Sequence, residues 1–368
     1  MNRLQKEFLD KIYYNFTHNS KRYNESYKSE HWKYQNKRKL DLFKIDNLEN
    51  FRNNGLSTGL DDQFYNKQKT ENLLNSLILD LTEKYVYNLL EDKNIGNVKD
   101  FLSFKDKYYS ANELFHIKYT SLLEKFFEIK ESKVICEIGP GYGSFINKLF
   151  KRKPFKAILI DLPEANFINA YFLKNMFPNK NFFFSTDIKN EITQDIFKDY
   201  DILILCPWDN IDNLKIDFFI NTRSMMEMNF NVIKSYFDFI HQYLIDDGYF
   251  LNINRYEKTS VGYPIRISEY PYDTNWKVLI SEPSFNQNWV HFLLTQRSFK
   301  KNEANIFEEL NNIKIIGSKF YVKVDYSSRF MILKKILRKI LRITFGSKFL
   351  NYIGNFLFKI GNKLKNLK

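Results

Sequence analysis

Cysteine is scarce in this 368-residue sequence, and long apolar runs are absent. The two cysteines, Cys136 and Cys206, lie in apolar, strand-like runs. We therefore interpret them as buried free thiols, which excludes a disulfide framework and a cysteine metal site. No run of 18 apolar residues exists, and because a membrane-spanning helix needs about 20, the sequence predicts none. The first residues lead into a polar amphipathic stretch and not into a signal peptide, so we expect a cytoplasmic protein.

Acidic residues are absent from the end of the chain. Residues 330–368 contain ten Lys or Arg and no Asp or Glu, whereas the whole chain has a formal net charge of +13. Ten of these charges therefore belong to the tail, and residues 1–329 carry only +3. A protein that binds nucleic acid is expected to be basic on the domain that does the work. We therefore expect no nucleic-acid partner.

The same tail has apolar residues at helical spacing. Between Met331 and Arg342, apolar residues alternate with basic pairs, and apolar residues continue from Phe349 to Ile360. A basic amphipathic helix of this kind is suited to an anionic membrane surface, which would make the protein peripheral on the inner face of the membrane. The alternative is a helix that packs on its own domain or on a second copy of the chain, because an apolar helix face must be covered.

Residues 1–130 have mostly helical patterns. Apolar residues recur at helical intervals over 73–81 and 114–127, which predicts core-facing helices. Residues 23–39 are rich in Lys, Tyr and His, and we interpret them as a solvated helix face. The polar, glycine-containing stretch 50–62 is either a linker or a loop that faces a substrate. We expect a helical cap over 1–130, an α/β domain over 131–325 and a tail over 326–368.

The α/β domain begins with a strand, a glycine turn and a helix. Val134–Ile138 is a short apolar run that suits a buried parallel strand. Gly139, Gly141 and Gly143 follow at alternate positions, and without Cβ atoms they permit a sharp turn and close approach of a ligand. The apolar residues of 144–152 then have helical spacing. Strand, glycine turn and helix together are typical of a Rossmann-like nucleotide site.

The spacing and the acids indicate which nucleotide. A dinucleotide fingerprint is G-x-G-x-x-G, whereas the glycines here are G-x-G-x-G and Glu137 stands two residues before the first. A carboxylate at that place repels a pyrophosphate and pairs with an ammonium group such as that of S-adenosylmethionine. Asp161 ends the next apolar run, 18 residues after Gly143. At that place its carboxylate can accept hydrogen bonds from both ribose hydroxyls.

These residues carry a resemblance to a known family. Glu-Ile-Gly-Pro-Gly-Tyr-Gly followed by Leu-Ile-Asp-Leu-Pro-Glu resembles the class I methyltransferases that depend on S-adenosylmethionine. The resemblance implies an α/β, Rossmann-like, doubly wound sheet with closing antiparallel strands, and S-adenosylmethionine as cofactor. The alternative is a glycine turn in some other α/β protein.

From Lys133 onwards, apolar runs alternate with helical patterns, as in a doubly wound sheet. The predicted strands are 134–138, 157–161, 216–221, 249–254 and two closing strands within 276–299. The predicted helices are 144–152, 164–176 and one from Ile233 that ends at the capping signal Asp247-Gly248.

The third strand has two candidates, 181–187 and 201–206, and we favour 201–206. The adenine would then lie near Trp208 as a stacking face. If the strand is 181–187, Asp187 would face the adenine amino group instead.

The loop after strand four, 221–229, is where chemistry is expected, because ligands bind at the carboxyl ends of such strands. It lacks the Pro-Pro clamp that methyltransferases acting on the amino group of a base have at this place. Enzymes that methylate a cytosine carbon need a Pro-Cys nucleophile, whereas the order here is Cys206-Pro207. Hydroxyl methylation needs only alignment and a base. Glu227 is the first candidate base, and its alternative role is to pair with a helix dipole.

Two more residues are candidates for the site. His291 is the second candidate base because histidine titrates near neutral pH, although a lone histidine in an apolar run is more often structural. Arg223 is a candidate to bind a phosphate or carboxylate of the substrate through a bidentate contact. The alternative is that it is a surface arginine. We find no cluster with metal-ligand spacing and expect no metal.

A narrower resemblance rests on three stretches. Phe-Arg-x-x-x-Leu-Ser-x-Gly-Leu-Asp at 51–61, Glu-Ile-Gly-x-Gly-Tyr-Gly, and Asn-x-x-Ser-x-x-Glu-Met after strand four resemble the sugar O-methyltransferase family of bacterial surface-polysaccharide loci. The resemblance covers about residues 50–300 and implies methyl transfer to a sugar hydroxyl of a nucleotide-linked or lipid-linked glycan. The chain departs from that pattern over residues 181–200. Rival functions are a methyltransferase for nucleic acid or another small molecule, and a non-catalytic scaffold. The oligomeric state stays open.

Overall fold

A computed structural model describes residues 3–22, 27, 29–37, 39–56, 66–98, 102–189, 191–299 and 305–321. Residues 1–321 form one compact unit, and residues 322–368 are assigned to a second. The predicted tail helix, 330–368, lies outside the described residues, as does the stretch Ser57–Asp61 of the narrower resemblance. Within the described part of the chain, no helix is long and apolar enough to cross a membrane.

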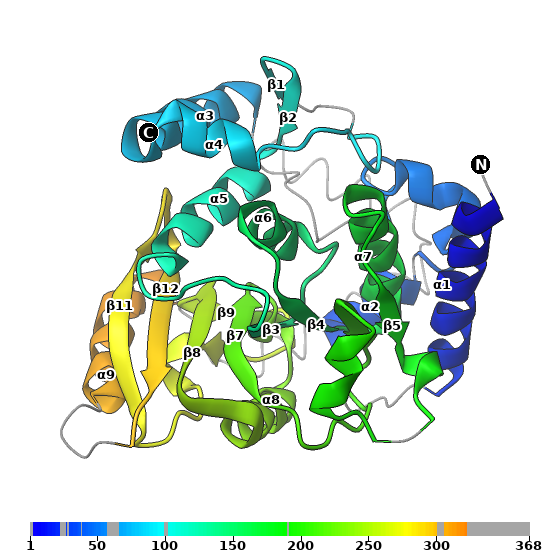
Figure 1. Cartoon of the computed structure of the whole chain (residues 1–368). Helices are drawn as coiled ribbons and strands as arrows, with labels where there is room; N and C mark the ends of the chain where they lie inside the picture. Colours follow the sequence, from blue (N-terminus) through cyan, green and yellow to red (C-terminus); the bar gives the residue numbers. More distant parts are fainter. Residues whose placement is uncertain are drawn as a thin grey trace, which may run out of the picture. The chain divides into compact units, whose positions relative to one another are not determined.

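The centre of the first unit is an eight-stranded sheet with the order β11-β12-β8-β7-β3-β4-β6-β5 (Figure 1). Neighbouring strands from β5 to β8 are parallel, whereas β12 runs antiparallel to both β8 and β11. This arrangement confirms the predicted Rossmann-like, doubly wound sheet with closing antiparallel strands. Its strands are β3 (Val134–Ile138), β4 (Lys156–Ile160), β5 (Phe182–Phe184), β6 (Ile202–Leu205), β7 (Ile216–Thr222), β8 (Leu244–Arg255), β11 (Trp276–Ser284) and β12 (Gln287–Arg297).

The choice of third strand is confirmed, with an addition. β6 pairs with β4, as favoured, while the competing run also forms a strand, β5, which pairs with β6 at the edge of the sheet. All three residues of β5 are buried. The reason is the N-terminal helix α1 (Arg3–Lys21), whose Phe8 ring lies 5.4 Å from that of Phe182. This helix gives the apolar run of β5 a partner that the local pattern does not reveal.

The predicted helix stop at Asp247-Gly248 is wrong. Helix α8 (Phe230–Tyr243) ends earlier, and β8 begins at once with Leu244, which pairs with Ile216 of β7. Asp247 has φ of +61° inside this strand, where the pairing with β7 is irregular. This dipeptide therefore lies at an irregular position of strand β8 and does not cap a helix.

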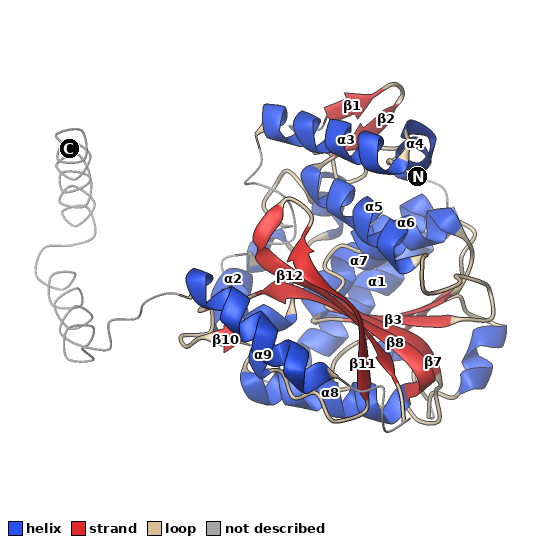
Figure 2. Ribbon diagram, turned by 90° about the vertical axis from the view of Figure 1, so that its left-hand side faces the viewer, coloured by secondary structure: helices blue, strands red, loops and turns tan. Residues whose placement is uncertain are grey.

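Helices cover both faces of the sheet (Figure 2). Because side chains alternate between faces along a strand, β3 sends Ile135 to one apolar cluster and Cys136 to the other. The first cluster also contains residues of α1, α5, α6 and α7, and the second contains residues of α8 and α9. The bounds of these helices are α5 (Ala111–Leu123), α6 (Ser144–Arg152), α7 (Pro163–Met176) and α9 (Ile306–Gly317). Both cysteines are buried and free, as predicted.

The N-terminal region is helical, as predicted, with a small hairpin. Its further elements are α2 (Glu30–Lys37), α3 (Lys67–Leu81), α4 (Glu83–Leu89), β1 (Leu102–Phe104) and β2 (Lys107–Tyr109). A second small pair, β9 (Glu257–Lys258) and β10 (Ile265–Arg266), follows β8. Apolar residues of α1, α3, α4 and α5 belong to the same cluster as one face of the sheet. The N-terminal region therefore shares the core of the sheet.

A buried charge cluster joins the N-terminal region to the helix that follows the glycine turn. Arg52 Nη1 lies 3.2 Å from Glu91 Oε2, and Lys148 Nζ of α6 lies 3.2 Å from Glu113 Oε1. The side chains of all four residues are at most 2% exposed. Burial raises the pKa of Glu91, whereas the Lys148 charge outweighs burial at Glu113 and holds the pKa of that carboxyl below its usual range. Removing one member would leave another buried charge without a partner, which is costly.

Candidate cofactor and acceptor site

A cavity of about 730 Å³ opens at the carboxyl ends of the central strands. Its volume lies in the range of small-molecule sites, and its place is the one where doubly wound sheets bind ligands. Residues from β3, β7, β8 and β12, from the loops that follow β4 and β7, and from α2 and α5 line it. The protein therefore builds the site from both its sheet and its N-terminal region.

The glycine turn forms one wall of this cavity. Gly139, Gly141 and Gly143 have φ values of +71°, +59° and +90°, a region that side chains disfavour. A Cβ atom on Gly139 would also overlap the Ser224 hydroxyl. Gly139 and Gly141 line the cavity, whereas Gly143 is the N-cap of α6 and does not. The turn is thus fixed by backbone conformation and by close packing against the loop after β7.

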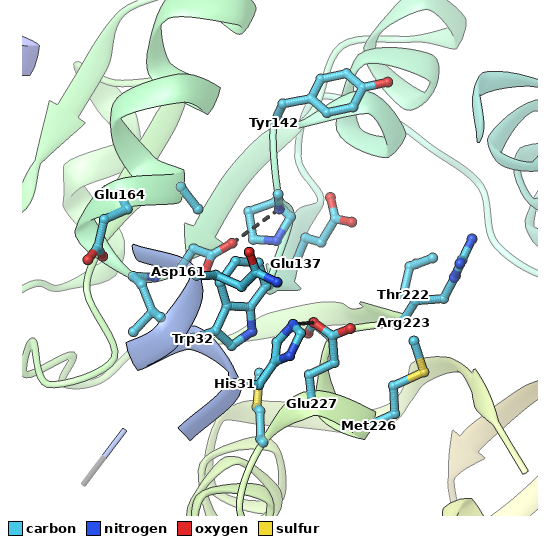
Figure 3. Close-up of a pocket in the computed structure, with 18 of the residues that line it drawn as sticks. His31, Trp32, Glu137, Tyr142, Asp161, Glu164, Thr222, Arg223, Met226 and Glu227 are labelled. Carbon is cyan, nitrogen blue, oxygen red and sulfur yellow. Dashed lines mark hydrogen bonds and ion pairs between the residues drawn. The ribbon is translucent and has the colours of Figure 1, made fainter. Parts of the chain in front are cut away.

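Two buried carboxyl groups lie beside the glycine turn (Figure 3). Burial, with the neighbouring Asp161 charge, raises the pKa of Glu137 to about 8. Among the described residues, Glu137 Oε2 has no hydrogen-bond partner. Burial also raises the pKa of Asp161 to about 7, although Asp161 accepts hydrogen bonds from the backbone N–H groups of Gly141 (3.1 Å) and Leu162 (2.7 Å). A buried oxygen without a donor is costly, so Glu137 is suited to receive a cationic or hydrogen-bonding ligand.

Neither residue predicted for the adenine is among those that line the cavity. Trp208 packs near Tyr27, with ring centroids 6.4 Å apart, and it is its neighbour Pro207 that lines the cavity. Asp187 Oδ2 forms an ion pair with Lys11 of α1 (2.7 Å) and accepts a hydrogen bond from the Phe184 backbone. Apolar side chains occupy this end of the cavity instead, namely Ile160, Leu162, Ala165 and Ile168.

Glu227, the first candidate base, lines the cavity at the end of a short 3₁₀ turn, Met225–Glu227. It forms an ion pair with Lys258 of β9, and its Oε2 lies 4.0 Å from His31 Nε2 of α2 (Figure 3). Burial lowers the pKa of His31, although the Glu227 charge opposes this shift. The helix that was expected to be solvated therefore brings a largely neutral imidazole to the candidate base.

His291, the second candidate base, is not among the residues that line the cavity. It is buried in β12, where Nε2 bonds to Ser281 Oγ (2.8 Å) and Nδ1 to Tyr256 Oη (3.0 Å). Burial lowers its pKa to about 3. Its environment is that of a structural core histidine.

A different histidine faces the cavity. His116 of α5 lines it, stacks on Phe145 and bonds through Nδ1 to Ser144 Oγ (2.9 Å). Burial lowers its pKa to about 3, so it is neutral at physiological pH. Sequence reasoning missed His116 and His31 because it looked for site residues in the loops after the strands, whereas both histidines belong to helices that precede the glycine turn. The one local signal for His116 is that α5 is the last helix before β3.

The loop after β7 is held by buried amides. Asn221 Nδ2 donates to the Ile138 carbonyl (2.8 Å) and to Ser224 Oγ (2.6 Å), and Asn254 Nδ2 donates to Asn221 Oδ1 (2.8 Å). The Met226 backbone N–H donates to Asn254 Oδ1 (3.2 Å). These contacts tie the loop to the ends of β3 and β8, so Glu227 and Arg223 project from a rigid support, as binding groups require.

Arg223 lines the cavity from the first residue after β7. It has φ of +62°, and its backbone N–H donates to the Ile253 carbonyl at 2.7 Å. No carboxylate among the described residues forms an ion pair with its guanidinium. Within the same described part of the chain, no group of three or more His, Cys, Asp or Glu could hold a metal ion.

Neither a protein-family model nor a curated protein matches this sequence. Among solved structures, part of the chain is similar to mitomycin 7-O-methyltransferase, with 14% identity over 51% of this chain and 57% of that one and a TM-score of 0.33. It is also similar to magnesium protoporphyrin IX methyltransferase from Synechocystis PCC 6803 (10% identity, 51% and 84% covered, TM-score 0.37). A third is a SAM-dependent methyltransferase from Aquifex aeolicus (14% identity, 48% and 88% covered, TM-score 0.29). These likenesses are distant, and the fold assignment rests on the strand order of the sheet.

Proposed function

We propose that this protein binds S-adenosylmethionine and transfers its methyl group to a sugar hydroxyl in the biosynthesis of a cell-surface polysaccharide. The observation that carries the proposal is the pair of buried carboxyl groups, Glu137 and Asp161, at the glycine turn. One oxygen of Glu137 has no hydrogen-bond donor among the described residues, which suits the α-ammonium group of the cofactor. Asp161 follows β4 at the edge of the same cavity, which suits the ribose hydroxyls.

The residues of the chain divide the remaining tasks. When bound, the cofactor would supply a methyl group on a sulfonium, and the C–S bond electrons would stay with sulfur as the new C–O bond forms. Glu227 is the candidate acceptor for the hydroxyl proton, because it is the carboxylate among the cavity-lining residues of the loop after β7. Positioning by the rigid loop would contribute alongside this proton transfer. The sugar as acceptor rests on the resemblance of the three sequence stretches.

The test is calorimetric titration of S-adenosylmethionine into the wild type and into Asp161→Ala. We expect binding by the wild type and its loss, or at least a tenfold weakening, in the variant. No binding by folded wild type would remove the enzyme hypothesis and favour the scaffold. Binding that persists unchanged in Asp161→Ala would place the cofactor elsewhere.

We also propose that residues 330–368 contact an anionic membrane surface, on the strength of their ten basic residues and helical apolar spacing. The full chain should cosediment with vesicles that contain phosphatidylserine, and not with neutral phosphatidylcholine vesicles. Binding to RNA without binding to the anionic vesicles would instead support the nucleic-acid alternative.

A further inference from the structure

The candidate base Glu227 has a different neighbour at each of its two carboxylate oxygens. Lys258 of β9 forms an ion pair with Glu227 Oε1, and Nε2 of His31 in α2 is 4.0 Å from Glu227 Oε2 (Figure 3). All three residues line the cavity, and their side chains are between 11% and 24% exposed. One oxygen of the carboxylate therefore pairs with a cation, whereas the other has an imidazole ring as its neighbour.

The distance of 4.0 Å between Glu227 Oε2 and His31 Nε2 is too long for a direct hydrogen bond. It is a distance that one oxygen atom can bridge, because an oxygen about 2.8 Å from both atoms makes an angle of about 90° between them. The His31 ring lies edge-on to that of Trp32, with centroids 5.4 Å apart, and both residues line the cavity. The carboxylate and the imidazole are therefore placed to hold one oxygen atom of a ligand between them.

The kind of bridging group follows from what each side can donate or accept. Burial lowers the pKa of His31, and although the Glu227 charge opposes this shift, the ring is largely neutral at physiological pH. The charges of Lys258 and Lys39 act in the same direction as burial. A neutral imidazole donates through one nitrogen, and an ionised carboxylate only accepts. With the ring proton on Nε2, the bridging atom must accept from His31 and donate to Glu227, which a hydroxyl group can do and an ionised carboxylate cannot.

We propose that Glu227 Oε2 and His31 Nε2 together hold the hydroxyl group that is methylated, with its oxygen between the two atoms. The inference rests on the proposed function for the methyl donor, and it adds that α2 of the N-terminal region contacts the acceptor. In the reaction, the hydroxyl O–H bond breaks and its proton moves to Glu227, while an electron pair of the oxygen forms the bond to the transferred methyl carbon. His31 donates a hydrogen bond that orients the oxygen. A carboxylate acceptor would be repelled by Glu227, so the pair selects hydroxyl acceptors.

The test is nitrogen-15 NMR of the histidine side chains of the full chain, titrated with pH while saturated with S-adenosylmethionine or with S-adenosylhomocysteine. The chain has five histidines, and His31→Gln identifies the signals of His31. We expect the neutral His31 ring to carry its proton on Nε2. The pKa of His31 should be lower with S-adenosylmethionine by about 0.5 or more, the effect of a sulfonium charge about 6 Å away in water. His241, which lies 3.9 Å from Asp273 and does not line the cavity, is the internal control, and its pKa should be the same in both complexes.

Glu227→Gln tests the pairing itself. The Glu227 charge raises the pKa of His31, so its removal should lower that pKa by about 0.7 or more, the effect of a charge 4.0 Å away in water. A ring proton on Nδ1, or a His31 pKa that is the same in both complexes or unchanged in Glu227→Gln, would overturn the hydroxyl site even though both ligands bind. Failure of both ligands to bind to folded wild type would instead overturn the proposed function, and the hydroxyl site with it. If Glu227→Gln does not fold, the comparison of the two wild-type complexes gives the answer.

Discussion

Replacing Glu137 by Gln should stabilise the protein without ligand and weaken cofactor binding. The carboxyl group is buried, and its pKa rises from 4.5 to about 8 on folding. Below pH 4.5 the group is protonated in both states. As the pH rises toward 8, the unfolded chain loses the proton and the folded protein keeps it, so the free energy of unfolding falls. At 1.36 kcal/mol per unit, the loss is about 3 kcal/mol at pH 7 and about 5 kcal/mol above pH 8.

A glutamine cannot ionise, so the variant should lack this pH-dependent loss. We therefore expect Glu137→Gln to have a higher thermal midpoint than the wild type, with a difference that grows between pH 6 and pH 8. S-adenosylhomocysteine should raise the midpoint of the wild type through binding to the folded state and raise that of the variant much less, because an amide oxygen can accept a hydrogen bond from the ammonium group but carries no charge to pair with it. Thermal unfolding followed by circular dichroism at pH 6 and pH 8, with and without ligand, measures these midpoints for both proteins.

Glu113→Gln is the matched control, because it makes the same substitution at an equally buried glutamate that has cationic partners. The pKa of Glu113 is held below its usual range, and its removal leaves Lys148 without its buried partner. This variant should lose about 3–5 kcal/mol, the opposite sign. A Glu137→Gln protein that is less stable than the wild type at pH 8, or that keeps its affinity for S-adenosylhomocysteine, would refute the assignment of Glu137 as the ammonium ligand.

Three further outcomes follow from the site. Glu227→Gln should lower the methyl-transfer rate about 10²- to 10⁴-fold with S-adenosylhomocysteine affinity unchanged, measured by product formation and calorimetry. His291→Ala should cost about 1–3 kcal/mol, because Ser281 and Tyr256 lose their partner, while turnover of the folded protein stays at the wild-type level; a specific loss of turnover would restore His291 as a base. Gly139→Ala should weaken S-adenosylhomocysteine binding in calorimetry and lower the thermal midpoint, because its Cβ would overlap the Ser224 hydroxyl.

The parts of the fold that sequence predicted well are those that local spacing determines. The glycine turn, its flanking strand and helix, and the place of Asp161 follow from residues within about one βαβ unit. The helix stop at Asp247-Gly248 failed because a positive φ at Asp247 serves a strand as well as it would serve a cap. The dipeptide Asp247-Gly248 alone does not show whether its turn conformation ends a helix or lies within a strand.

The parts of the site that sequence missed depend on contacts between distant segments. His31 reaches the cavity only because α2 lines it together with Glu227, a residue more than 100 positions away in the sequence. Trp208 was predicted to stack on the adenine because it follows β6 by three residues. Its ring instead lies near that of Tyr27. The Lys, Tyr and His content of 23–39 favoured a solvated helix face, but composition does not show what that face contacts.

The buried charge cluster explains how the N-terminal region and the glycine turn act as one structure. Arg52 precedes the first β-hairpin, Glu113 lies in α5, and Lys148 lies in α6, which begins at the turn. The Arg52 guanidinium also lies 4.4 Å from the ring centroid of Tyr142, inside the turn itself. Because breaking a buried ion pair is costly, the position of the turn is coupled to that of the N-terminal region. The same region supplies His31 and His116 to the cavity, so the glycine turn and this part of the cavity wall share one rigid support.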